Sequence, residues 1–156
     1  MADLITCYHG SLRDTQLRYP SRTPVVPVHH PRSAGSVGML NGMAKTVLHI
    51  EDDALVARAC ARAFKHAGYD VVNVTTAELA VAALQSRSFD YIVSDFDLEC
   101  GTGGDVVTWA KTMCPGVLTR WMWLTSNECA LTYHDAPFMQ KPAHMRDVLS
   151  MLSSIT

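Results

Sequence analysis

The sequence lacks the features of a membrane-embedded, exported or strongly charged protein. None of its apolar stretches approaches the roughly 20 residues that a helix needs to cross a bilayer. The N-terminus shows no charged-then-apolar signal peptide. The formal net charge is only −2, which provides no bulk attraction for nucleic acid or an anionic membrane. We therefore expect neither of them as a partner.

The number of cysteines is odd. The five residues are Cys7, Cys60, Cys100, Cys114 and Cys129, with no C-x-x-C pair among them. This pattern argues against a disulfide framework. Reduced thiols in a cytoplasmic protein are the simplest interpretation.

The composition favours one folded domain preceded by a tail. Of the 156 residues 48% are hydrophobic and 18% charged, which excludes global disorder. Residues 1–43 have no regular hydrophobic period, and their prolines block strand pairing. We predict a flexible tail over 1–43, either functional or an artefact of start-site choice, and one domain over 44–156.

Short apolar runs alternate with helical patterns from Lys45 onward. The predicted strands are Val47–Ile50, Val71–Thr75, Tyr91–Ser94, Thr119–Leu124 and Pro137–Met139. Apolar residues at helical spacing predict helices over 56–67, 77–84, 106–113 and 145–152. Thr75-x-x-Glu78 resembles a capping box that opens the second helix. Strands alternating with helices indicate an α/β fold with a parallel sheet covered on both faces.

Acidic, hydroxyl-bearing and basic residues follow four of these strands. They are Asp52 and Asp53, then Asp95, then Thr125 and Ser126, then Lys141. The C-terminal ends of parallel strands share one edge, where ligands bind, so these side chains should converge in one pocket. Three carboxylates, a hydroxyl and an ammonium group suit Mg²⁺ and a phosphoryl group.

These motifs, in this order, resemble the receiver domain of two-component response regulators. The matching segments are Glu51-Asp52-Asp53, Ser94-Asp95-Phe96-Asp97-Leu98, Thr125-Ser126 and Lys141-Pro142. The resemblance covers about residues 45–153. It implies a flavodoxin-like, doubly wound sheet of five parallel strands in the order 2-1-3-4-5.

The resemblance also implies a metal site and a phosphoacceptor. Asp95 matches the aspartate that attacks phosphorus and becomes an aspartyl phosphate. Asp52 and Asp53 match the acidic pair that binds Mg²⁺ together with Asp95 and the backbone carbonyl of Asp97. A less specific interpretation of Asp52 and Asp53 is an N-cap and first-turn charge on the following helix.

Further roles follow for residues of the last two strands. Lys141 matches the lysine that pairs with Asp95 and then with a phosphoryl oxygen. Thr125 matches the hydroxyl that binds another phosphoryl oxygen. Thr125 and Phe138 match the switch residues that respond to phosphorylation, although plain core packing also explains Phe138.

Two departures from the family pattern are informative. Asp97, two residues after Asp95, is acidic, and we hypothesise that it adds negative charge near the phosphoryl group. Only 15 residues separate Thr125 from Lys141, too few for a loop, an average helix and an average strand. We therefore expect an abbreviated or irregular fourth helix, a non-standard partner surface, and a monomer or weak dimer.

The favoured function is Mg²⁺-dependent phosphoryl transfer to Asp95 from a histidine kinase or a histidine phosphotransfer protein. The result would be altered binding to a downstream protein, which makes the chain a signalling phosphoacceptor rather than an enzyme. Only three residues follow Ser153, so we expect a stand-alone, cytoplasmic receiver. A phosphorylation-independent interaction module is the main alternative. A haloacid-dehalogenase-like phosphatase is a weaker one, suggested by Asp95-x-Asp97.

Overall fold

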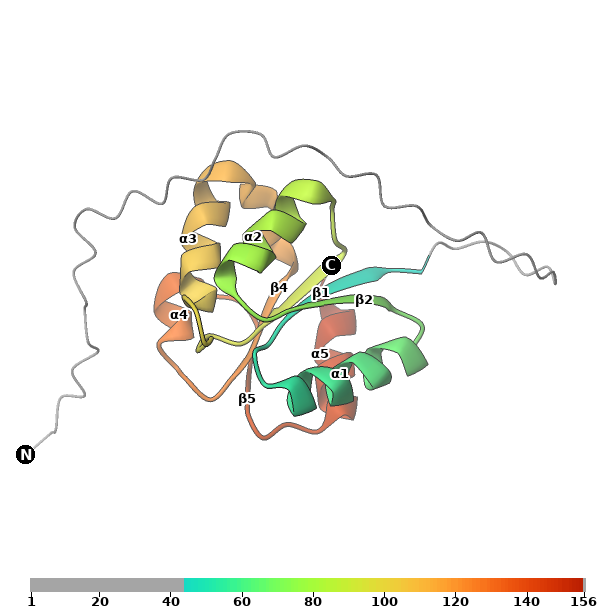
Figure 1. Ribbon diagram of the computed structural model, residues 1–156. Coiled ribbons are helices and arrows are strands. Elements are labelled where there is room, and N and C mark those ends of the chain that lie inside the picture. Colours follow the sequence, from blue (N-terminus) through green and yellow to red (C-terminus); the bar gives the residue numbers. More distant parts are fainter. Residues whose placement is uncertain (1–43, 156) are drawn as a thin grey trace, which may run out of the picture. The chain divides into compact units, whose positions relative to one another are not determined.

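The computed structural model describes residues 44–155 as a five-stranded parallel sheet with helices on both faces (Figure 1). The strands are β1 (Thr46–Ile50), β2 (Asp70–Val74), β3 (Tyr91–Ser94), β4 (Trp121–Thr125) and β5 (Phe138–Gln140). The helices are α1 (Ala54–His66), α2 (Ala77–Ser86), α3 (Gly103–Met113), α4 (Ala130–Tyr133) and α5 (Met145–Ser154), with a 3₁₀ helix η1 (Pro115–Arg120). The strand order β2-β1-β3-β4-β5 confirms the predicted flavodoxin-like topology.

The sheet separates two hydrophobic layers, because neighbouring side chains of a strand point to opposite faces. Helices α1 and α5 cover one face, and α2, α3 and α4 cover the other (Figure 1). On β1, Val47 packs in the α1–α5 layer, whereas Leu48 and Ile50 pack in the α2–α3 layer. Both neighbours of β1 pair with it in parallel, so it lies inside the sheet, buried on both faces.

Local signals at two element boundaries differ from the sequence expectation. The cap of α2 is Thr76, whose hydroxyl accepts the amide proton of Leu79, so the capping box expected at Thr75 was wrong. A capping box opens α3 instead, between Thr102 and Asp105. Strand β4 begins at Trp121, because the preceding residues form η1.

Helix α4 has four residues, which confirms the predicted abbreviation. Aromatic contacts hold this segment against α3. The Tyr133 ring lies so close to Gly104 that a Cβ on that glycine would be 2.7 Å from it. The same ring lies 5.4 Å from the Phe96 ring, and the indole N–H of Trp123 donates to the carbonyl of His134 at 3.0 Å. Packing therefore replaces the helical turns that the short segment cannot form.

The helices of residues 44–155 are all too short or too polar to cross a membrane. Residues 1–43, where the sequence predicts a tail, lie outside the described residues.

One buried titratable group lies within the α1–α5 layer. His49 of β1 is 1% exposed, packs edge-on against the Phe64 ring at 5.7 Å, and donates from Nδ1 to Asn73 Oδ1 at 3.0 Å. Burial disfavours the imidazolium and lowers the pKa of His49 from 6.5 to about 4, although the bond to Asn73 acts in the opposite direction.

Stability should therefore fall as the pH drops from 6.5 toward 4. The unfolded chain, with the ordinary histidine pKa, takes up the proton before the folded chain does. Between pH 7.5 and 5 we expect His49 to remove about 2 kcal/mol of unfolding free energy. Urea unfolding of the wild type and His49→Leu at both pH values measures this difference. His49→Leu should reduce the pH dependence of the unfolding free energy. His66→Gln, at an exposed position of α1, should leave that dependence as it is in the wild type. An equal pH dependence in the wild type and His49→Leu would contradict the assignment of the effect to His49.

Candidate functional site

The predicted polar residues converge at the C-terminal edge of the sheet. Asp52 follows β1, Asp95 follows β3, and Lys141 follows β5, in the order that brings their strand ends together. They line a pocket of about 400 Å³. Its other lining residues are Glu51, Asp53, Val56, Asp97, Leu98, Glu99 and Ser126. The convergence expected from parallel strand geometry is therefore present.

The carboxylate of Asp95 is fixed at both of its oxygens. Oδ1 accepts the backbone N–H of Phe96 at 2.6 Å and that of Asp97 at 3.3 Å. Oδ2 lies 2.5 Å from Nζ of Lys141. The backbone of its own loop thus orients one oxygen, while a cation that follows β5 contacts the other.

Lys141 also pairs with a second carboxylate, that of Glu51, at 2.5 Å. Glu51 is 1% exposed, and burial raises its pKa against the opposing influence of the ammonium group. Burial by itself would lower the pKa of Lys141, but the hydrogen bonds to Asp95 and Glu51 outweigh it, and the net pKa is raised. The lysine is therefore held as a cation between two acids.

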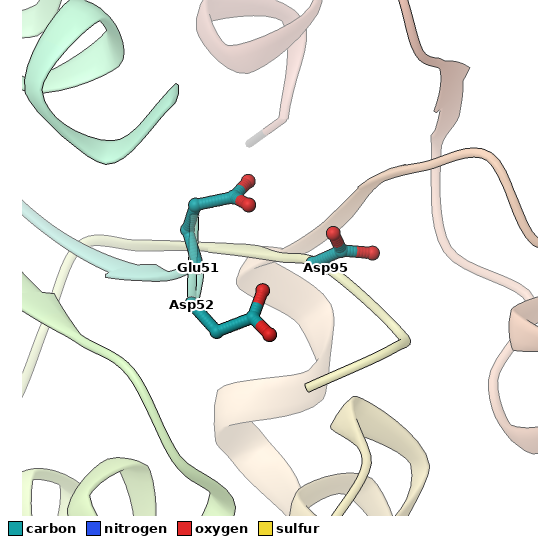
Figure 2. Close-up of side chains that lie close together, drawn as sticks. All are labelled: Glu51, Asp52 and Asp95. Atoms are coloured by element: carbon teal, nitrogen blue, oxygen red, sulfur yellow. The ribbon is translucent and has the colours of Figure 1, made fainter. Parts of the chain in front are cut away.

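Glu51, Asp52 and Asp95 form a cluster of carboxylates (Figure 2). One oxygen from each lies within 4.8 Å of the others. Lys141 is the cation in contact with this cluster. Its single positive charge balances one of the three carboxylates, so negative charge remains uncompensated. Hard oxygen donors and excess negative charge fit a divalent cation such as Mg²⁺, which takes carboxylate ligands and keeps several waters.

Asp53 lies in a different arrangement from the one that the sequence suggested. Its Oδ1 accepts the backbone N–H groups of Leu55 at 2.7 Å and Val56 at 3.1 Å, so it is the N-cap of α1. These bonds, that of Val56 first, lower the pKa of Asp53. The first turn of a helix has amide groups without intrahelical partners, and they attract this carboxylate. Asp53 is therefore the helix cap, and Glu51 rather than Asp53 belongs to the carboxylate cluster.

Glu51 is the residue that sequence reasoning missed. A signal was available, because an aspartate directly before a helix occupies the preferred N-cap position. Assigning Asp53 to the cap leaves Glu51 and Asp52 as the acidic pair. Glu51 also shares the strand face of His49 and Val47 by the two-residue period, which directs it inward.

The loops after β3 and β4 are joined beside Asp95. The side-chain amide of Asn127 donates to both carboxylate oxygens of Asp97, at 3.0 and 3.1 Å. Thr125 is fully buried, and its hydroxyl oxygen accepts the N–H of Asn127 at 3.2 Å. The carboxylate of Asp97 is thus held by Asn127, the residue that follows Thr125-Ser126. Its negative charge lies close to the loop that carries Asp95.

Phe138 and Gly103 are packing residues near the site. Phe138 on β5 is partly buried and packs on the α2–α3 layer, as expected for a core residue. A Cβ on Gly103 would lie 2.3 Å from the carbonyl oxygen of Asp95 and 2.8 Å from Oγ of Ser94. Only glycine therefore lets the start of α3 pack directly against the Asp95 loop.

Comparison with known proteins shows which family the chain belongs to. Residues 47–153 match the response regulator receiver domain family. Over 117 residues the chain is 30% identical to the photosynthetic apparatus regulatory protein RegA of Rhodovulum sulfidophilum. That match covers 72% of this chain and 64% of RegA, so the chain spans less than two thirds of that relative.

Solved structures share the fold at lower identity. The chemotaxis response regulator CheY4 of Vibrio cholerae superposes with a TM-score of 0.66 at 21% identity, covering 73% of this chain and 100% of that one. A CheY-like receiver domain protein of Methanospirillum hungatei JF-1 gives a TM-score of 0.65 at 20% identity, covering 71% and 92%.

Proposed function

Because the chain belongs to the response regulator receiver domain family, we propose that it accepts a phosphoryl group on the carboxylate of Asp95. The observation that carries this proposal is the pairing of Asp95 Oδ2 with Nζ of Lys141 at 2.5 Å, beside an acidic cluster. The fixed carboxylate is a ready nucleophile, and the ammonium group is close enough to follow the charge onto a phosphoryl oxygen.

In the proposed reaction, one carboxylate oxygen of Asp95 forms a bond to phosphorus. The bond from phosphorus to the donor's histidine nitrogen breaks, and that nitrogen keeps the electron pair. Oδ2 is the better candidate, because two backbone N–H groups hold Oδ1, whereas the contact of Oδ2 is the Lys141 ammonium group, which can move onto a phosphoryl oxygen. The hydroxyl of Thr125 and the N–H of Ser126 would then bind the remaining phosphoryl oxygens. Catalysis of this kind is positioning and charge neutralisation.

We assign the metal ligands to Glu51, Asp52 and Asp95, with the backbone carbonyl of Asp97 as a further ligand. This set replaces Asp53 with Glu51, because the cap of α1 already uses the Asp53 carboxylate. Mg²⁺ held there would neutralise charge on the transferred phosphoryl group. Glu51 is also bound to Lys141, so the lysine and the metal would share its two oxygens.

The proposed partners are a histidine kinase or a histidine phosphotransfer protein as donor and a downstream protein as target. Thr125 and Phe138 remain the proposed switch residues. The short α4, held by Tyr133, supports the expectation of a non-standard partner surface and of a monomer or weak dimer. We keep residues 44–156 as the receiver domain and the cytoplasm as its proposed location.

Incubation with acetyl phosphate and Mg²⁺ should add one phosphoryl group to the chain, detected as a gain in intact mass. Asp95→Asn removes the nucleophile and should abolish the gain, as should chelation of Mg²⁺. No gain in the wild type, under conditions where an established receiver is labelled, would favour a phosphorylation-independent module.

The effect of substitution on Mg²⁺ affinity should differ between the neighbouring residues Asp52 and Asp53. We expect Glu51→Gln and Asp52→Asn each to weaken Mg²⁺ at least tenfold, about 1.4 kcal/mol, by removing a ligand. Asp53→Asn should change affinity much less, because asparagine preserves the α1 cap and the lost charge is not a ligand. Calorimetric titration measures all three; an equal loss in Asp53→Asn would return that residue to the metal site.

Asp97→Asn tests whether the extra acid shortens the life of the aspartyl phosphate. Removing a like charge near the phosphoryl group should stabilise the phosphorylated form and slow its loss about fivefold, or about 1 kcal/mol. Asparagine can still accept from Asn127, so the loop contact is preserved. Decay of phosphorylated protein by intact mass gives the rate, with Asp70→Asn, at the start of β2 and away from the pocket, as a charge-matched control. A rate equal to that of the wild type would remove the idea.

A further inference from the structure

A second cavity, separate from the acidic pocket, lies along α1 on the side of the edge strand β2. Helix α1 and strand β2 lie beside each other in the fold (Figure 1). The cavity has a volume of about 550 Å³, within the range of small-molecule sites. We call it the α1–β2 groove; its lining residues are Leu55, Arg58, Ala61, Arg62, Lys65 and Asn73.

The groove concentrates positive charge without a balancing acid. Arg58, Arg62 and Lys65 are spaced four and three residues apart, so they form one stripe along the helix. Among residues 44–155 none of the three has a carboxylate within ion-pair distance, whereas Arg87 and Arg146 do. Lys65 complements the C-terminal end of α1. Arg58 donates from Nε to the carbonyl of Ala54 at 3.0 Å, which does not balance its charge, and like charges one turn apart repel each other.

Asn73 adds a neutral donor to the same cavity, and its orientation is fixed from inside the protein. Its Oδ1 accepts the Nδ1–H of buried His49 at 3.0 Å. That bond turns the other end of the amide, Nδ2, away from His49. Nδ2 donates to no described residue, which leaves it available to a ligand. An exposed side chain, oriented by its bond to the buried His49, thus presents a hydrogen-bond donor beside three cations.

We propose that the α1–β2 groove binds a small molecule carrying a diphosphate group. Two guanidinium groups offer paired donors that match phosphate oxygens, and Lys65 adds a further positive charge. From Arg58 to Lys65 the helix rises about 10 Å, so two linked phosphate groups can contact more of this stripe than a single phosphate can. Leu55 is 72% exposed at one end of the groove and offers an apolar surface for the remainder of such a ligand.

Calorimetric titration of the full chain with inorganic pyrophosphate and with ADP tests the proposal. EDTA in the buffer keeps Mg²⁺ from carrying either compound to the acidic pocket. We expect saturable one-to-one binding that falls at least tenfold in Arg58→Gln/Arg62→Gln and in Asn73→Asp. Aspartate still accepts from His49 but replaces the free donor with a negative charge. Unfolding curves without ligand should confirm that Asn73→Asp is folded.

The matched control is Lys111→Gln/Arg146→Gln, which removes the same total charge from exposed positions on α3 and α5. It should bind both probes as the wild type does. Tighter binding of ADP than of pyrophosphate would indicate a nucleotide, and equal binding would indicate recognition of the diphosphate alone. Equal loss in the control, unsaturable heats, or full affinity in the groove variants would overturn the site. Binding should persist in Asp95→Asn, so this result is independent of phosphorylation.

Discussion

The site depends on the double ion pair of Lys141 with Glu51 and Asp95. These three residues follow β5, β1 and β3, so one ammonium group connects the C-terminal ends of three strands. Breaking a buried pair by removing one partner is far more damaging than its net contribution suggests, because the other charge is left unpaired. The lysine therefore constrains both the position of β5 and the orientation of the acceptor carboxylate.

The same interaction explains why the site suits an additional cation. Lys141 compensates one of the three negative charges of Glu51, Asp52 and Asp95, and burial already raises the pKa of Glu51. A divalent ion at the open side of the cluster would relieve this repulsion. The neighbouring Asp53 contributes elsewhere, because its charge is used by the first turn of α1. Two adjacent aspartates thus lie in different environments for a local, geometric reason.

The two faces of the sheet differ in the contacts made by their polar and aromatic side chains. On the α2–α3 face, Tyr133 and Trp123 hold an α4 of four residues, and the absence of a side chain at Gly104 makes the contact possible. On the α1–α5 face, His49 and Asn73 connect the interior to the α1–β2 groove. Both features lie away from the Asp95–Lys141 pair.

The sequence by itself determined the fold class, the strand order implied by the family resemblance, the short α4, and the convergence of Asp95 with Lys141. Period-two and helical patterns encode elements locally, and parallel strands share an edge wherever they form. An N-cap signal at Asp53 was present in the sequence, but only the tertiary structure shows the Asp53 side chain on the α1 cap and that of Glu51 in the carboxylate cluster, because the two differ by side-chain direction. Likewise, the bond between Asp97 and Asn127 joins residues 30 positions apart. No local pattern specifies such a contact, since it exists only once β3 and β4 pair.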